Sequence, residues 1–100
     1  MNITIEKGQS EHTIFIEGRI DTLTAPAFEE ACLPLITETS ANITIECKEV
    51  DYISSTGLRV FILANKKSTK FNGIVTIKNL NSFLKNIFDV SGLTVFFNFA

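Results

Sequence analysis

The chain has 100 residues, 45% of them hydrophobic, and a formal net charge of −2 at pH 7. Its length and apolar share suit one domain spanning residues 1–100, and its charge gives no electrostatic footprint for nucleic acid or an anionic membrane surface. No apolar run approaches the ~20 residues of a membrane span, and the first residues lack the basic and apolar regions of a signal peptide. We therefore expect a cytoplasmic protein that has no membrane span and binds no nucleic acid.

The first twenty residues predict a hairpin. Ile3 and Ile5 alternate with polar residues, as in a half-buried strand, and a turn follows over residues 7–10. The second strand should run from His12 to Glu17 and end at Gly18. Residues 19–24 then form a connecting loop or a brief extended piece.

A helix should follow this connection. Thr24 or Ala25 can cap it, and Pro26 suits its first turn, where a missing N–H costs little. The apolar residues recur with the spacing of an amphipathic helix: Phe28, Ala31, Cys32, Leu35 and Ile36. Pro34 does not fit this pattern, so it should either kink the helix or change its backbone bonding.

The rest of the chain alternates strands and helices. The expected elements are a strand at 43–47, a largely buried helix from about Ser55, a strand at 74–77, a helix capped by Asn81 or Ser82 with Phe83, Leu84, Ile87 and Phe88 on one face, and a last strand or extended tail at 95–99. Strand–helix–strand units imply parallel pairing, and the first hairpin adds an antiparallel edge. The sequence therefore predicts an α/β fold with a mixed sheet of four to five strands and three main helices.

The corner between the strand at 43–47 and the next helix carries an unusual cluster of hydroxyl groups. Ser54, Ser55 and Thr56 stand directly before Gly57 and an apolar helical run. The start of a helix offers unpaired N–H groups and the positive end of its dipole, which together favour a negative charge. The corner therefore suggests a phosphate acceptor, whereas the simpler interpretation is an ordinary helix cap.

The residues that other functions require are missing or scattered. A serine hydrolase needs G-x-S-x-G, but Ile53 stands where the first glycine should be, and His12 is the only histidine. Cys32 and Cys47 are expected to be buried free thiols. Neither metal-ligand spacing nor a glycine-rich nucleotide loop occurs. We therefore expect no enzymatic activity, no catalytic residue, no metal and no cofactor.

The stretch from Asp51 to Val60, DYISSTGLRV, resembles the signature of the STAS-domain anti-sigma factor antagonists. In that family a strand leads through a serine–glycine turn into a helix. The resemblance extends over nearly the whole chain, including residues 18–21, Pro26 with its helix, and residues 90–93. It implies a single STAS-like domain, with the helices packed on one side of the mixed sheet.

The resemblance also implies a function. The family's phosphoacceptor is the serine two residues before the glycine, which is Ser55 here. An anti-sigma factor with serine-kinase activity would phosphorylate it, the unphosphorylated chain would bind that kinase and release its sigma factor, and a serine phosphatase of the metal-dependent type would reset the switch. The partner-binding residues expected on this basis are Asp21, Ser54, Ser55, Thr56, Gly57 and Leu58. We also expect the chain to be a monomer.

One position departs from the family pattern. Many members carry aspartate directly before the acceptor, whereas this chain has Ser54, which places a second hydroxyl beside Ser55. An alternative function also stays open at this point. The chain could be a STAS interaction module of another signalling or transport complex that does not act on a sigma factor.

Overall fold

The computed structural model describes all 100 residues and contains a five-stranded sheet in the order β1-β2-β3-β4-β5. The strands are β1 (Asn2–Lys7), β2 (Glu11–Ile20), β3 (Asn42–Ile53), β4 (Val75–Lys78) and β5 (Asn98–Phe99). The helices are α1 (Ala25–Cys32), α2 (Ser55–Lys70) and α3 (Ser82–Val90), with 3-10 turns η1 (Leu33–Leu35) and η2 (Thr94–Phe96). β1 pairs antiparallel with β2, and all other neighbours are parallel. The predicted fold class is confirmed.

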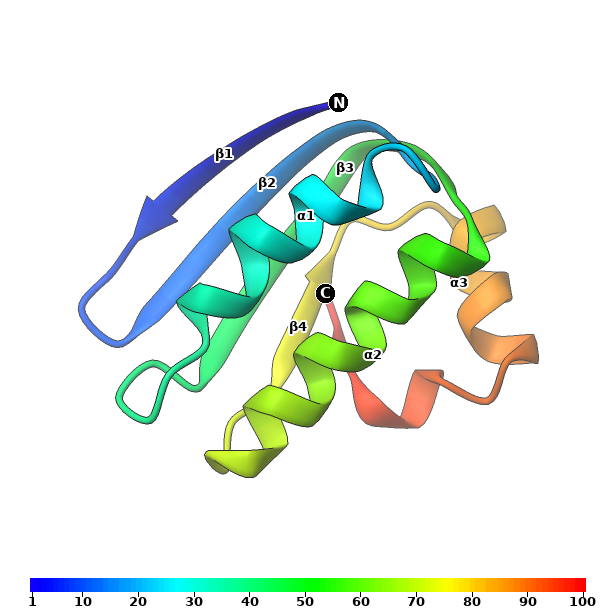
Figure 1. Ribbon diagram of the computed structural model, residues 1–100. Coiled ribbons are helices and arrows are strands. Elements are labelled where there is room, and N and C mark those ends of the chain that lie inside the picture. Colours follow the sequence, from blue (N-terminus) through cyan, green and yellow to red (C-terminus); the bar gives the residue numbers. More distant parts are fainter.

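The helices share one core with one face of the sheet. In Figure 1, α1 and α2 cross this face side by side, while β1 forms an edge of the sheet. Each helix contributes one fully buried phenylalanine, Phe28 from α1, Phe61 from α2 and Phe88 from α3. The Phe61 ring centroid lies 5.1 Å from that of Phe28 and 5.4 Å from that of Phe88, both in edge-to-face contact. Phe61 therefore fixes α2 between the other two helices.

Two strands are longer than predicted. β2 does not end at Gly18 but continues to Ile20, because Gly18 adopts a φ of +102° and the register of β2 against β3 shifts beside it. A positive φ is available to glycine at little cost, so the strand bends here without stopping. β3 likewise extends six residues past Cys47 and ends at Ile53, which pairs with Ile20. The two strands thus end together at the corner before α2.

Two helical predictions need correction. α1 ends at Cys32, and the chain then tightens into η1 around Pro34, so the proline changes the backbone bonding one turn before Ile36. Leu35 and Ile36 are buried nonetheless. In α3, Phe83 was expected on the same face as Leu84 and Phe88, but its side chain is 74% exposed. The helix turns Leu84 and Phe88 inward, which leaves Phe83 at its outer edge.

The remaining sequence expectations concern the cysteines and the ends of the helices. Cys32 and Cys47 are free and fully buried, and burial raises the pKa of each thiol to about 12. Asn81 caps α3, since its side-chain oxygen accepts the N–H of Leu84 at 2.8 Å. None of the helices is both long enough and apolar enough to cross a membrane.

Gly57, in the first turn of α2, provides a test of how tightly α2 packs on β2. A Cβ atom at this position would lie 2.8 Å from both the carbonyl oxygen and the Cγ2 atom of Ile20. Alanine is favoured over glycine in helices by about 1 kcal/mol, but overpacking costs about 1–3 kcal/mol. We expect Gly57→Ala to lower the free energy of unfolding by ~1–2 kcal/mol in urea denaturation. Lys66→Ala, at an exposed position of α2, is the control, and a Gly57→Ala variant as stable as the wild type would contradict the close packing.

Candidate functional site

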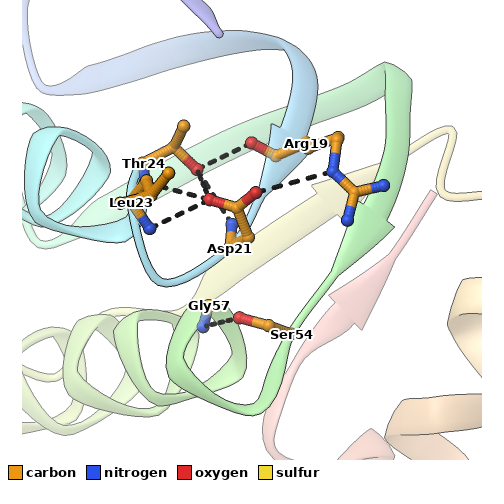
Figure 2. Close-up of polar contacts among 6 residues, drawn as sticks. All are labelled: Arg19, Asp21, Leu23, Thr24, Ser54 and Gly57. Carbon is orange, nitrogen blue, oxygen red and sulfur yellow. Dashed lines mark hydrogen bonds and ion pairs between the residues drawn. The ribbon is translucent and has the colours of Figure 1, made fainter.

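Ser54 joins the end of β3 to the start of α2. Its side-chain oxygen accepts the N–H of Gly57 at 3.1 Å (Figure 2). Its own N–H donates to the carbonyl oxygen of Ile20 at 2.8 Å. The first bond caps α2, and the second ties the corner to the end of β2. The capping role that the sequence left open for the whole hydroxyl cluster therefore belongs to Ser54.

Ser55, in contrast, neither caps α2 nor ties the corner to β2. It is the first residue of α2, its side chain is exposed, and its hydroxyl makes no hydrogen bond within the chain. The positive end of the α2 dipole and the first N–H groups of the helix lie beside it. Thr56, the next residue, reaches back to the β2–α1 loop (residues 21–24), with its hydroxyl oxygen 3.5 Å from that of Thr22. Leu58 is half-buried and packs against the core.

Asp21 organises the β2–α1 loop. Its Oδ1 accepts the N–H groups of Leu23 at 3.0 Å and Thr24 at 3.1 Å, and lies 3.2 Å from the Thr24 hydroxyl oxygen (Figure 2). Thr24 is the residue before α1, but its hydroxyl donates back to the Arg19 carbonyl at 2.7 Å and does not cap the helix. The carboxylate therefore holds the turn that brings this loop beside α2.

The charge of Asp21 is stabilised locally. Partial burial raises its pKa, but the hydrogen bonds from Thr24 and Leu23, together with Arg19, outweigh that effect and leave the pKa below its ordinary value of 3.8. Arg19 Nε lies 3.5 Å from Asp21 Oδ2, and its guanidinium stacks 4.1 Å from the Tyr52 ring centroid. The exposure of this pair keeps its contribution to stability small. Asp21 is thus ionised at neutral pH.

The structure brings the predicted residues to one corner without joining all of them. The β2–α1 loop and the first turn of α2 meet through the Ser54–Ile20 bond and the Thr22–Thr56 contact. Asp21 makes no hydrogen bond to Ser55, because its oxygens are engaged within its own loop and with Arg19. Gly57 is buried beneath the corner, so it shapes the surface from below. His, Cys, Asp and Glu side chains form no group that could hold a metal ion.

Leu23 is a candidate contact residue that the sequence analysis missed. Its side chain is 90% exposed at the tip of the β2–α1 loop, while its N–H is held by Asp21. A fixed loop that presents a leucine to solvent is typical of a binding surface more than of a core. The sequence DTLT did contain the signal, because aspartate two residues before an apolar residue can fold an Asx turn that directs the latter outward.

Comparisons with known proteins identify relatives of this chain. The STAS domain family model matches residues 2–100. The chain is 38% identical to the anti-sigma-B factor antagonist of Bacillus subtilis, over 93% of this chain and 86% of that protein. It is 34% identical to the anti-sigma-B factor antagonist of Listeria monocytogenes, over 94% and 85% of the two chains.

Solved structures share the fold. An anti-sigma factor antagonist from Mycobacterium paratuberculosis superposes with a TM-score of 0.84 at 21% identity, over 98% of this chain and 83% of that one. The phosphorylated form of the Bacillus cell fate determinant SpoIIAA has a TM-score of 0.78 at 15% identity, over 99% and 91%. These two structures show the shared fold, while the family model and the two relatives show that this chain belongs to the STAS-domain family of anti-sigma factor antagonists.

Proposed function

We propose that the chain is a regulatory switch controlled by phosphorylation of Ser55. The unphosphorylated form binds an anti-sigma factor of the serine-kinase type in the cytoplasm and so releases its sigma factor. Phosphorylation abolishes this binding, and a metal-dependent serine phosphatase restores it. The observation that carries the proposal is the division between the two serines, in which Ser54 caps α2 while the Ser55 hydroxyl is exposed and unbonded.

In this proposal Ser55 is a substrate and the chain has no catalytic activity. The Ser55 oxygen attacks the γ-phosphorus of ATP bound by the kinase, the new O–P bond replaces the bond to ADP, and the serine proton passes to a base of the kinase. Asp21 is the carboxylate at the corner, but it is engaged with its own loop and Arg19 and makes no hydrogen bond to Ser55. His12, the chain's only histidine, lies near the start of β2, eight residues before Ile20, or roughly 26 Å along the strand.

The physical basis of the switch is a charge placed where the fold tolerates it and the partner does not. A phosphate adds a charge of about −1.5 to −2, and a helix N-terminus favours such a charge. The proposed contact surface comprises Asp21, Leu23, Ser54, Ser55, Thr56 and Leu58, shaped by the buried Gly57. Leu23 would bury its exposed side chain against the partner, while Asp21 would repel the new phosphate and so add to the loss of affinity.

Ser55→Ala is expected to abolish phosphorylation by the cognate kinase, because it removes the exposed hydroxyl at the start of α2 that does not serve as the helix cap. Intact-mass measurement after incubation with kinase, ATP and magnesium should show one added phosphate in the wild type and none in the variant. Ser82, the first residue of α3 after the Asn81 cap, is an internal control, since it occupies the same helical position.

Ser54→Ala should still be phosphorylated, while losing about 1 kcal/mol of stability because the cap of α2 is lost. Incubation of the wild type with ATP and magnesium alone should add no phosphate. The assignment would be overturned if a stably folded Ser54→Ala variant gained no phosphate while Ser55→Ala still gained one. The acceptor would then be Ser54.

Ser55→Asp is expected to weaken binding to the anti-sigma factor at least about tenfold, which is about 1.4 kcal/mol, because it places a negative charge in the interface. The melting temperature should change little, since the helix dipole favours an acidic residue there. Ser10→Asp, in the β1–β2 turn at the opposite end of β2, is the charge control and should bind normally. A Ser55→Asp variant that binds normally would show that charge at this site is not the switch.

Asp21→Asn is expected to slow phosphorylation or weaken kinase binding, because it removes a fixed negative charge beside the acceptor while keeping the side-chain oxygen that bonds Leu23 and Thr24. The measurements are the initial rate of phosphate incorporation and the dissociation constant. Asp51→Asn, an exposed position near the end of β3, controls for the loss of one charge. If both variants match the wild type, Asp21 has only a structural role in its loop.

The structural role of Asp21 has its own signature in the pH dependence of stability. Because its pKa in the folded protein is lowered, its ionised form adds stability that is present above the ordinary value of 3.8 and is lost as the pH falls through the lowered pKa. The Asp21→Asn variant should lack this step in acid denaturation, whatever the result with the kinase.

A further inference from the structure

Arg59 lies one helical turn after Ser55 on α2, and nothing in the chain pairs with it. It is exposed and forms neither an ion pair nor a side-chain hydrogen bond, although the chain has eleven acidic residues. Residues four apart are neighbours on a helix surface, with Cβ atoms about 5–6 Å apart. A helical side chain also points back toward the N-terminus and covers the preceding turn. The i, i+4 spacing therefore places Arg59 next to Ser55 on the surface of α2.

A groove beside Arg59 leaves its side chain free to move, although Ser55 itself does not line this groove. A cleft of about 190 Å³ lies between α1 and α2, and its lining includes Thr56 and Arg59 from α2 and Pro26, Glu29 and Glu30 from α1. Arg59 thus lines the same open space as Thr56, the residue that follows the acceptor. Neither glutamate comes within ion-pair distance of the guanidinium. The guanidinium has room to move within the cleft and has no partner to release.

We propose that Arg59 binds the phosphate on Ser55 within the same molecule. This inference rests on the proposed function for the identity of the modified residue. Arginine suits the task because its planar guanidinium can donate two parallel hydrogen bonds to phosphate oxygens, and the N–H groups at the start of α2 complete the site. Arg59 is a positioning residue for the phosphorylated state and takes no part in the transfer of the phosphate.

The pairing adds a second effect to the added charge. In the unphosphorylated chain Arg59 presents a free cation beside the acceptor. After phosphorylation the same cation is bound to the phosphate. The partner then faces a pair with net negative charge and can no longer contact a free Arg59 guanidinium. The pair also fixes the phosphate against α2, so the modified surface has one geometry instead of a mobile charged group.

The test uses protein with phosphoserine genetically encoded at position 55, so that no kinase is needed. The measurement is the second pKa of the phosphate, followed by ³¹P NMR between pH 5 and 8. A neighbouring cation favours the dianion, so we expect this pKa to be lower in the wild type than in Arg59→Gln by about half a unit, roughly a threefold change in proton affinity. Asp21 in the neighbouring loop and Glu29 and Glu30 across the cleft are common to all variants, so their contributions cancel.

Lys66→Gln is the matched control. It removes one positive charge from the same helix eleven residues after Ser55, roughly 16 Å away along the axis. It should leave the phosphate pKa unchanged, and Arg59→Lys should give an intermediate value because a lysine supplies charge without the paired donors. In the wild type alone, the Arg59 Nε–H signal should shift downfield on phosphorylation.

Equal phosphate pKa values in the wild type and Arg59→Gln, or an equal shift in Arg59→Gln and Lys66→Gln, would overturn the inference. The two proposals fail separately. A chain that no kinase phosphorylates would contradict the proposed function while leaving this titration intact. If the kinase phosphorylates Ser55 but the phosphate pKa does not depend on Arg59, only the pairing is contradicted.

Discussion

The close approach of α2 to the end of β2 is the constraint on which the rest of the site depends. The Ile20 carbonyl accepts the Ser54 N–H at 2.8 Å, and Gly57, three residues later, leaves no room for a side chain above the same carbonyl. This contact sets the corner at the end of β3, and it also brings the β2–α1 loop beside the first turn of α2. If α2 lay farther from β2, the contact between the Thr56 and Thr22 hydroxyls would be lost, and the β2–α1 loop would separate from the first turn of α2.

This arrangement explains why adjacent serines differ so strongly. A helix start needs one side chain to satisfy its N–H groups, and the backbone of Ser54, in the extended region at φ −83° and ψ 172°, places its oxygen where Gly57 can donate. Ser55 already has helical geometry, and its exposed hydroxyl makes no hydrogen bond within the chain. Modification of Ser55 therefore leaves the cap intact, whereas modification of Ser54 would compete with it. The local geometry alone favours Ser55 as the group that can change without loss of the fold.

The sequence predicted most where the signals are local. The start of α2, the Asn81 cap and the mixed sheet follow from hydroxyl and amide residues before apolar runs and from the alternation of elements. The extension of β2 through Gly18 could not be predicted in this way, because it depends on pairing with a distant part of the chain, as when Gly18 pairs with Val50 of β3. The exposure of Phe83 was hidden for a similar reason, since helical spacing gives a face but tertiary packing decides where that face ends. At the site, the family resemblance singles out Ser55 as the proposed acceptor, but the loop that presents Leu23 depends on hydrogen bonds to Asp21 that no periodicity reports.

The core favours charge over a change of shape as the means of the proposed regulation. Phe61 lies on the buried side of α2, wedged between Phe28 and Phe88, so α2 cannot shift without disturbing both other helices. Packed cores resist small displacements, and a phosphate at the exposed end of such a helix has no compliant element to move. Its effect must then come through what it presents to a partner. On a rigid helix the positions of Ser55 and Arg59 are fixed relative to each other, so the proposed pairing with a phosphate requires only a change of rotamer in Arg59.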